Sequence, residues 1–235
     1  MSVKVRAEKP AEAKDKNKGT ENIAGIGIRI TAPNFKFLQL KVENMPNSPL
    51  VIHAFSAKAR EMMKMRQEQG STSNSKRNRK PKDFNALYNE ARHLAKQGWD
   101  GIAAAAFRNA MVSACRTVGV KMTLAKLAFS IEADGVDRDS GMPLVKIYGT
   151  PIKFESTVRL ETGVADVRIR PRWDKWHAMV RVRYDADMLT AEDVANLLMR
   201  AGMQCGICEG RPDSKNSCGQ GWGTFSISGT IKKPE

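Results

Sequence analysis

The order in which strand-like and helix-like patterns follow one another constrains this chain more than any single motif. Alternating apolar residues predict strands, and the first of these has Leu38, Leu40 and Val42 on one face and Phe35 and Phe37 on the other. Apolar residues at helical spacing predict helices. Strands are expected over residues 35–42, 124–133, 144–148, 154–160, 164–173, 176–184 and 224–228, and helices over residues 56–69, 83–97, 103–118 and 190–201.

Without its longer excursions, this order reduces to strand, helix, strand, strand, helix, strand. It predicts an α+β protein with a ferredoxin-like βαββαβ core, which is also the scaffold of the RNA-recognition module, and with accessory β-hairpins. Residues 1–22 contain few large apolar side chains and are expected to form a flexible tail. Residues 23–231 are expected to form one domain with a basic insertion at about 56–98, and residues 232–235 a short C-terminal tail.

Two predicted strands, 164–173 and 176–184, are expected to form a hairpin because only Asp174 and Lys175 separate the flanking tryptophans. Arginine occupies alternate positions in both strands, so each strand presents its arginines on one face. If the register agrees, one positive patch results, and arginine suits phosphate because its guanidinium donates two parallel hydrogen bonds. The patch would contain Arg168, Arg170, Arg172, Arg181 and Arg183. The alternative is a solvated face, or ion pairs with Asp166 and Asp185.

The net charge of +14 comes from 39 Lys and Arg against 25 Asp and Glu. Nine basic residues face two acidic ones between residues 57 and 82, so half of the net charge lies in one polar stretch. Such a balance is typical of proteins that bind a phosphate backbone, although a cationic surface without a polyanionic partner is the alternative. The candidate binding residues in this stretch are Lys58, Arg60, Lys64, Arg66, Lys76, Arg77, Arg79 and Lys80.

A glycine-rich loop between residues 206 and 223 is the third candidate element, and Arg211 and Lys215 lie within it. Glycines at this density leave backbone N–H groups open to a phosphate, or allow tight packing. The spacing of Cys205, Cys208 and Cys218 would also suit a metal or redox site, but no histidine is near enough in sequence to complete a ligand set. We therefore expect no metal and no cofactor, and whether these cysteines bind metal stays open.

No hydrolytic motif is found, and the sequence favours a protein that is not an enzyme. Phe55, Trp173 and Trp222 are candidates for stacking on bases, although core packing is the usual role of such side chains. No apolar run approaches the roughly 20 residues that a bilayer helix needs, and the N-terminus lacks the apolar segment of a secretory signal. We expect no membrane partner and a cytoplasmic location.

Three stretches resemble the RAMP superfamily, the fold of backbone subunits in CRISPR effector complexes. Residues 102–110 are similar to the start of that family's first helix, and residues 206–227 to its glycine-rich loop and last strand. Residues 53–58 resemble the segment that leads into the family's finger or thumb insertion. The resemblance implies subunits that assemble side by side along one nucleic-acid strand, with Lys58, Arg60, Arg108 and the glycine-rich loop facing it.

The expected function is therefore non-enzymatic binding of single-stranded RNA or DNA, with assembly into a filament-like homo-oligomer. One alternative is a phage-type protein that coats or anneals single-stranded DNA. A second alternative is a ribonuclease subunit, for which the sequence gives no convincing catalytic residue. The choice between RNA and DNA stays open.

Overall fold

The computed structural model describes residues 20–22, 29–54, 83–159, 165–213 and 219–228. The chain divides into two units, Met1–Asn34 and Phe35–Glu235. In the first unit, β1 (Thr20–Asn22) pairs antiparallel with β2 (Arg29–Thr31). The second unit contains the remaining described elements and the candidate sites.

The main sheet of the second unit is antiparallel throughout, so the protein belongs to the α+β class. Its strand order is β12 (Phe225–Ile227), β3 (Phe35–Asn44), β11 (His177–Asp185), β8 (Pro143–Tyr148) and β5 (Gly101–Ala103). Two short strands pair off this path: β6 (Phe129–Glu132) with β11, and β7 (Gly135–Val136) with β8. The strands β6 and β8 share one edge of β11, because β8 pairs with its first residues and β6 with its last.

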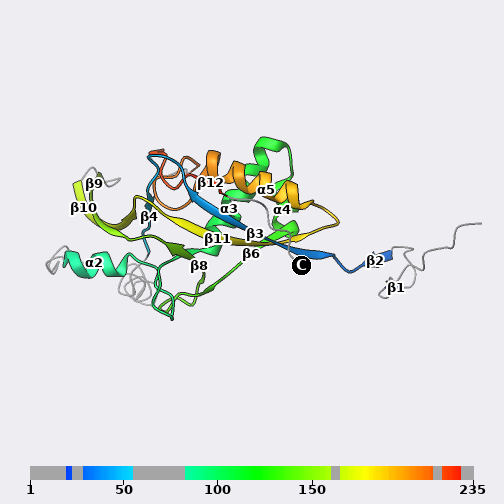
Figure 1. Ribbon diagram of the computed structural model, residues 1–235, viewed down its shortest axis with the longest axis horizontal. Helices are drawn as coiled ribbons and strands as arrows, with labels where there is room; N and C mark the ends of the chain where they lie inside the picture. The colour runs from blue at the N-terminus through cyan, green and yellow to red at the C-terminus, as the bar shows by residue number, and fades with distance from the viewer. Residues whose placement is uncertain (1–19, 23–28, 55–82, 160–164, 214–218, 229–235) are drawn as a thin grey trace, which may run out of the picture. The chain divides into compact units, whose positions relative to one another are not determined.

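Three helices lie on one side of β3 and β11: α3 (Ala104–Ala114), α4 (Met122–Ala128) and α5 (Ala191–Arg200) (Figure 1). A 3₁₀ turn, Cys115–Val118, follows α3, and a π turn, Ala201–Cys205, follows α5. The predicted apolar face of β3 faces the core: Leu38, Leu40 and Val42 are buried. The alternation in β11 likewise buries Val180 and Val182. Burial of these two stripes beneath the helices is the main source of stability for the sheet.

A second, three-stranded sheet has the order β4 (Leu50–Val51), β10 (Ala165–Trp173), β9 (Ile152–Arg159). The helix α2 (Phe84–Glu90) contacts β10, and its N-cap Asp83 accepts hydrogen bonds from the backbone N–H groups of Asn85 and Ala86. This helix ends at Glu90, seven residues before the predicted end. The chain beyond it belongs to the body of the unit, because Ala91 and Ala95 are buried.

The predicted hairpin of residues 164–173 and 176–184 is wrong. The two segments are strands, but β10 pairs with β4 and β9, whereas β11 pairs with β3, β6 and β8. The chain crosses from one sheet to the other between Trp173 and Trp176, both fully buried. Burial of two indole rings contributes more free energy here than a tight hairpin turn would. The alternation of side chains shows which residues share a face of a strand, but it does not show which strands are neighbours.

The predicted strand over residues 124–133 is wrong in its first half, where α4 runs to Ala128 and only Phe129–Glu132 is a strand. A short apolar run does not distinguish a buried strand from a helical turn by periodicity alone. The predicted helix over residues 56–69 lies outside the described residues. The other predicted strands and helices are confirmed, with ends that differ by a few residues. Every helix in the described part of the chain is too short or too polar to cross a membrane.

Candidate nucleic-acid interface

The face of the main sheet opposite the helices carries exposed aromatic and cationic side chains, and we call it the open sheet face. It consists of alternate residues of β3 and β11 and of residues on β6 and β8 that share their side. Register sets Phe37 beside Arg183, and Gln39 beside Arg181. The members used below are Phe35, Phe37, Gln39, Lys41, Glu132, Lys146, Tyr148, His177, Arg181 and Arg183.

The aromatic members of this face are accessible to a flat ligand. Phe35, Phe37 and Tyr148 are 44%, 49% and 39% exposed. Tyr148 and His177 stack in parallel, with ring centroids 4.8 Å apart and an interplanar angle of 6°. The guanidinium of Arg183 lies 5.0 Å from the Phe35 ring centroid. Exposed rings beside cations are the arrangement on which unpaired nucleobases stack, whatever their sequence.

The two arginines of this face already have acidic partners. Arg181 Nη2 lies 3.1 Å from Asp134 Oδ1, and Arg183 Nε lies 3.7 Å from Glu132 Oε1. Both arginine side chains are 45% exposed. Exposed ion pairs of this kind contribute little free energy, so the two arginines can exchange these partners for other anions at small cost.

The other three arginines of the predicted patch lie on β10, so the five do not form one surface. Arg170 is buried, with Nη2 3.3 Å from Glu209 Oε1 and Nη1 3.3 Å from Ser156 Oγ. Arg172 Nε lies 2.6 Å from Asp174 Oδ1. The buried guanidinium of Arg170 connects β10 to the glycine-rich loop and has a structural role, which corrects its assignment to a surface patch.

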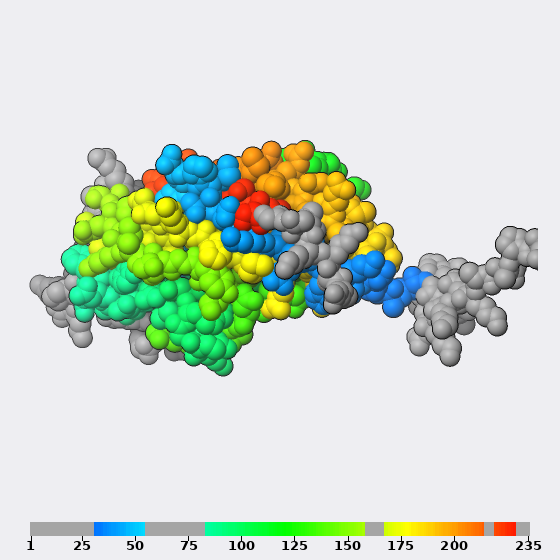
Figure 2. Space-filling view, viewed as in Figure 1, coloured from blue at the N-terminus to red at the C-terminus, as the bar shows by residue number. Residues whose placement is uncertain are grey.

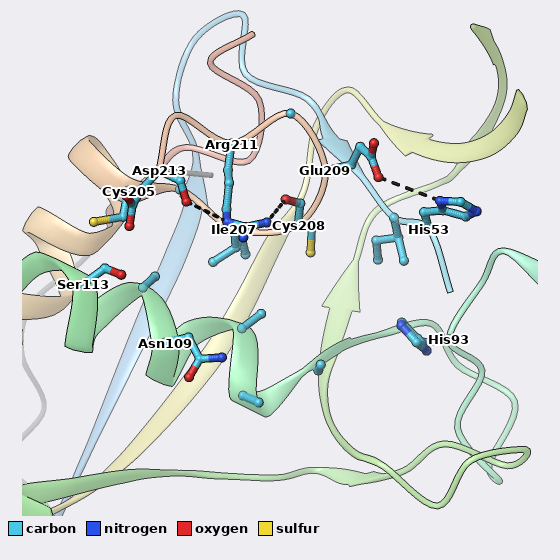
Figure 3. A pocket seen from close by; sticks show the side chains of 17 residues that line it. His53, His93, Asn109, Ser113, Cys205, Ile207, Cys208, Glu209, Arg211 and Asp213 are labelled. Atoms are coloured by element: carbon cyan, nitrogen blue, oxygen red, sulfur yellow. Dashed lines mark hydrogen bonds and ion pairs between the residues drawn. The ribbon is translucent and has the colours of Figure 1, made fainter. Parts of the chain in front are cut away.

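A cavity of about 520 Å³ lies on the helix side of the sheet, between α3 and the glycine-rich loop (Figure 3). We call it the glycine-loop cavity. Small side chains of α3, including Ala105 and Ala106, form one wall, and residues 205–211 with Asp213 form the other. Gly210 is required in that wall, because a Cβ there would lie 2.5 Å from the ring of Trp222. The cavity combines segments that are far apart in sequence.

Two histidines line the same cavity, each beside a carboxylate. His53 Nδ1 is 3.9 Å from Glu209 Oε2, and His93 Nδ1 is 3.3 Å from Asp137 Oδ2. Burial, and then the charge of Arg170, lower the pKa of His53 below its ordinary value, so it is neutral at pH 7. Burial opposes ionisation of Asp137, but hydrogen bonds led by that from Ser140 outweigh it and lower the pKa of Asp137.

The cysteines give no support for a metal centre in the described residues, where no cluster of three or more His, Cys, Asp or Glu is found. Burial raises the pKa of the Cys208 thiol to about 12, and burial also raises the pKa of Cys115 and Cys205. Burial therefore favours the protonated form of these thiols, which is not the form that attacks a disulfide. Cys218 lies outside the described residues.

Several predicted site residues have other roles. Trp173 is fully buried, which corrects the prediction that it stacks on bases. Trp222 is half-buried and contacts Phe154 edge to face, at 5.6 Å between centroids. Arg108 donates to the backbone oxygens of Lys126 and Phe129, and Arg211 donates to those of Cys208 and Asp213. Arg108 thus fastens the end of α4, whereas Arg211 shapes the loop and lines the cavity.

The remaining predicted site residues lie outside the described part of the chain: Phe55, Lys58, Arg60, Lys64, Arg66, Lys76, Arg77, Arg79, Lys80 and Lys215. Arg168 lies on β10, on the same face as Arg170.

The sequence analysis missed Phe35, Phe37, Tyr148 and His177 as site residues. The sequence contains a signal for Phe35 and Phe37, because they lie on the face of the strand opposite its buried apolar residues. The sequence contains no signal for the stacked pair, because His177 and Tyr148 come together only through the pairing of β8 with β11.

No protein-family model matches this chain, and no curated protein matches it significantly. The function is therefore inferred from the geometry of the two candidate sites.

Proposed function

We propose that this protein binds single-stranded nucleic acid on its open sheet face. The observation that carries the proposal is the exposed rings at the two ends of β11, with Phe35 and Phe37 beside Arg183 at one end and Tyr148 stacked on His177 at the other. Stacking on an aromatic side chain contributes about 1–3 kcal/mol per base. Bases in a duplex are stacked on one another and are not available to these rings, so the face favours a single strand.

The arrangement of elements supports a ferredoxin-like core for this unit. The strands β12, β3, β11 and β6 are neighbours in that order, and all pairs are antiparallel. The helix α3 follows β3 before β6, and α5 follows β11 before β12. This is the connectivity of a split βαββαβ unit, in which RNA-recognition modules use the face opposite the helices.

The charge of the chain supports a polyanionic partner that arrives by long-range attraction. The open sheet face contains acidic as well as basic side chains, so its own field is weak. Nine of the basic residues lie between residues 57 and 82, against two acidic ones, in the stretch between β4 and α2. We propose that this stretch contributes phosphate contacts while the sheet stacks bases, and that several copies line up along one strand.

A binding measurement on single-stranded RNA and DNA oligonucleotides, read by fluorescence anisotropy, tests the proposal. Phe37→Ala is expected to weaken binding at least about fivefold, the lower end of the value of one stacked base. Phe84→Ala is the matched control, because Phe84 is a phenylalanine of α2 that is 40% exposed and does not belong to the face.

Affinity is expected to fall with salt and to be lower for a duplex. Equal affinities of the wild type, Phe37→Ala and Phe84→Ala would contradict binding on this face. Equal affinities for single strands and duplexes would contradict the stacking mechanism. A strand-pairing assay in the same experiment separates an annealing protein from one that only holds a strand.

A second candidate function, RNA cleavage, is favoured by the two histidines that line the glycine-loop cavity. A neutral His53 would remove the proton from a ribose 2′-hydroxyl as its oxygen attacks the adjacent phosphorus. His93, held by Asp137, would act as the general acid that gives a proton to the departing 5′-oxygen. The products would be a 2′,3′-cyclic phosphate and a 5′-hydroxyl, with no metal required.

Incubation of labelled RNA in EDTA tests this second function. Cleavage is expected to be lost in His53→Ala and in His93→Ala, and to be absent from a strand with 2′-deoxyribose throughout. His177→Ala, which changes a histidine of the open sheet face, is expected to retain it. Cleavage of equal rate in all variants, or of DNA, would contradict the assignment.

A further inference from the structure

The helix α4 presents its large apolar side chains outward, which is unusual for a short surface helix. It buries only Ala125 and Ala128. Leu124 and Leu127 are 47% and 75% exposed, and Val120, just before the helix, is 41% exposed. Leu124 and Leu127 are spaced i and i+3 within the helix, so they lie along one face. We call these two residues, together with Val120 just before the helix, the α4 ridge.

The α4 ridge has a positive border. Lys121 and Lys126 are both exposed and lie within the same stretch as its three apolar side chains. A partner for this surface therefore needs an apolar contact with a negative border. The two longest segments outside the described residues, 1–19 and 55–82, do not suit it, because they contain six and nine basic residues against three and two acidic ones.

The turn between β11 and α5 has the complementary character, and we call it the acidic turn. Met188 is 47% exposed there. Asp185, Asp187 and Glu192 surround it in sequence, with Asp187 and Glu192 exposed. The acidic turn thus offers an apolar side chain within a negative border, which is the inverse of the ridge.

The ridge and the acidic turn lie at the same end of the main sheet. Tyr184, next to Asp185, pairs with Phe129, which follows the last residue of α4. Figure 2 shows the green surface of the segment around α4 beside the orange surface of α5 and the yellow surface of the turn that precedes it. A surface that contains both halves of a complementary pair can match itself across a two-fold axis, so that two identical contacts form at once.

We infer that the α4 ridge and the acidic turn form the interface of a two-fold homodimer. Leu124 and Leu127 of each copy contact the acidic turn of the other, and Lys126 faces the partner's carboxylates. The inference does not depend on the proposed binding of nucleic acid, because the interface lies on the helix side of the sheet and requires no strand to form.

Sedimentation velocity of the full chain, after nuclease treatment and over a range of protein concentrations, tests the inference. A monomer–dimer equilibrium is expected, and Leu127→Ser is expected to raise the dimer dissociation constant at least about tenfold. Ile152→Ser is the matched control, because Ile152 is also an aliphatic residue 47% exposed but lies on β9.

Charge reversal distinguishes this interface from other modes of self-association. Lys126→Glu and Asp187→Lys are each expected to weaken the dimer, and the double variant is expected to restore it, because every contact then has its charges exchanged. A wild type that stays monomeric up to about 100 μM would overturn the inference, as would a dimer that none of these variants weakens. Far-UV circular dichroism confirms that each variant is folded.

Discussion

At the scale of single residues, the glycine-rich loop depends on two different properties of glycine. Gly221 and Gly223 both have left-handed backbones, with φ of 73° and 66°. A Cβ at Gly221 would meet no atom within 4 Å, whereas one at Gly223 would lie 1.9 Å from the backbone oxygen of Ile207. Glycine is thus required at position 221 only for its backbone conformation. At position 223 it is also required because the chain passes close to the backbone of Ile207, in one wall of the cavity.

The two glycines give a matched pair of substitutions. Gly221→Ala is expected to lower the free energy of unfolding by about 1–2 kcal/mol, the ordinary cost of a left-handed alanine. Gly223→Ala is expected to lower it by at least about 2 kcal/mol more, because the loop has to move away from Ile207. Urea unfolding measures both, and equal losses in the two variants would contradict the close approach.

At the scale of elements, the sequence predicts local structure well where one pattern dominates. The helix α5 has its apolar stripe, Val194, Leu197 and Leu198, and a capping box in which Thr190 and Asp193 exchange hydrogen bonds. The faces of β3, β10 and β11 also follow from alternation. Helix α4 was mistaken for a strand because its large apolar residues face outward, which reverses the pattern that identifies a surface helix.

The acidic residue of the capping box predicts a pH-dependent contribution to stability. Hydrogen bonds from Thr190 lower the pKa of Asp193, so its folded pKa is below its unfolded one. Its contribution is therefore complete above the unfolded pKa and is lost as the pH falls through the folded pKa. Asp193→Ala is expected to cost about 1 kcal/mol at pH 7 and progressively less below pH 4.

Unfolding free energies of the wild type and Asp193→Ala, compared from pH 7 to pH 3, provide the measurement. Glu192→Ala is the control, since Glu192 lies in the same first turn but not in the capping box. A difference between the wild type and Asp193→Ala that stays constant with pH would exclude an ionised cap.

At the scale of the whole second unit, both sheets contribute to one core. Leu50 and Trp173 of the small sheet belong to the same buried cluster as Leu38 and Val182 of the main sheet. Pairing between strands far apart in sequence builds this core, as it builds the two candidate sites. For that reason the prediction that the arginines of each strand share one face was correct for β10 and for β11. The prediction that both sets lie on one surface was wrong. The stacked Tyr148 and His177 were beyond prediction for the same reason.

A shared core predicts that Phe35–Glu235 unfolds in one transition. The indole rings of Trp173 and Trp176, two of the four tryptophans, lie where the chain passes from one sheet to the other, so tryptophan fluorescence includes a signal from that junction. Far-UV circular dichroism reports on both sheets and the helices. The two signals are expected to give the same urea midpoint, and two separated transitions would mean that the sheets unfold independently.

The unequal lengths of β12 and β3 have a consequence for solubility. β12 has three residues and β3 has ten, and their pairing covers only Val42, Glu43 and Asn44 at the end of β3. Among the described residues, the first half of β3 has no strand partner on that side. A strand edge without a partner is a template for aggregation, and exposed charges such as those of Lys36 and Lys41 along this strand are the usual protection against edge-to-edge growth.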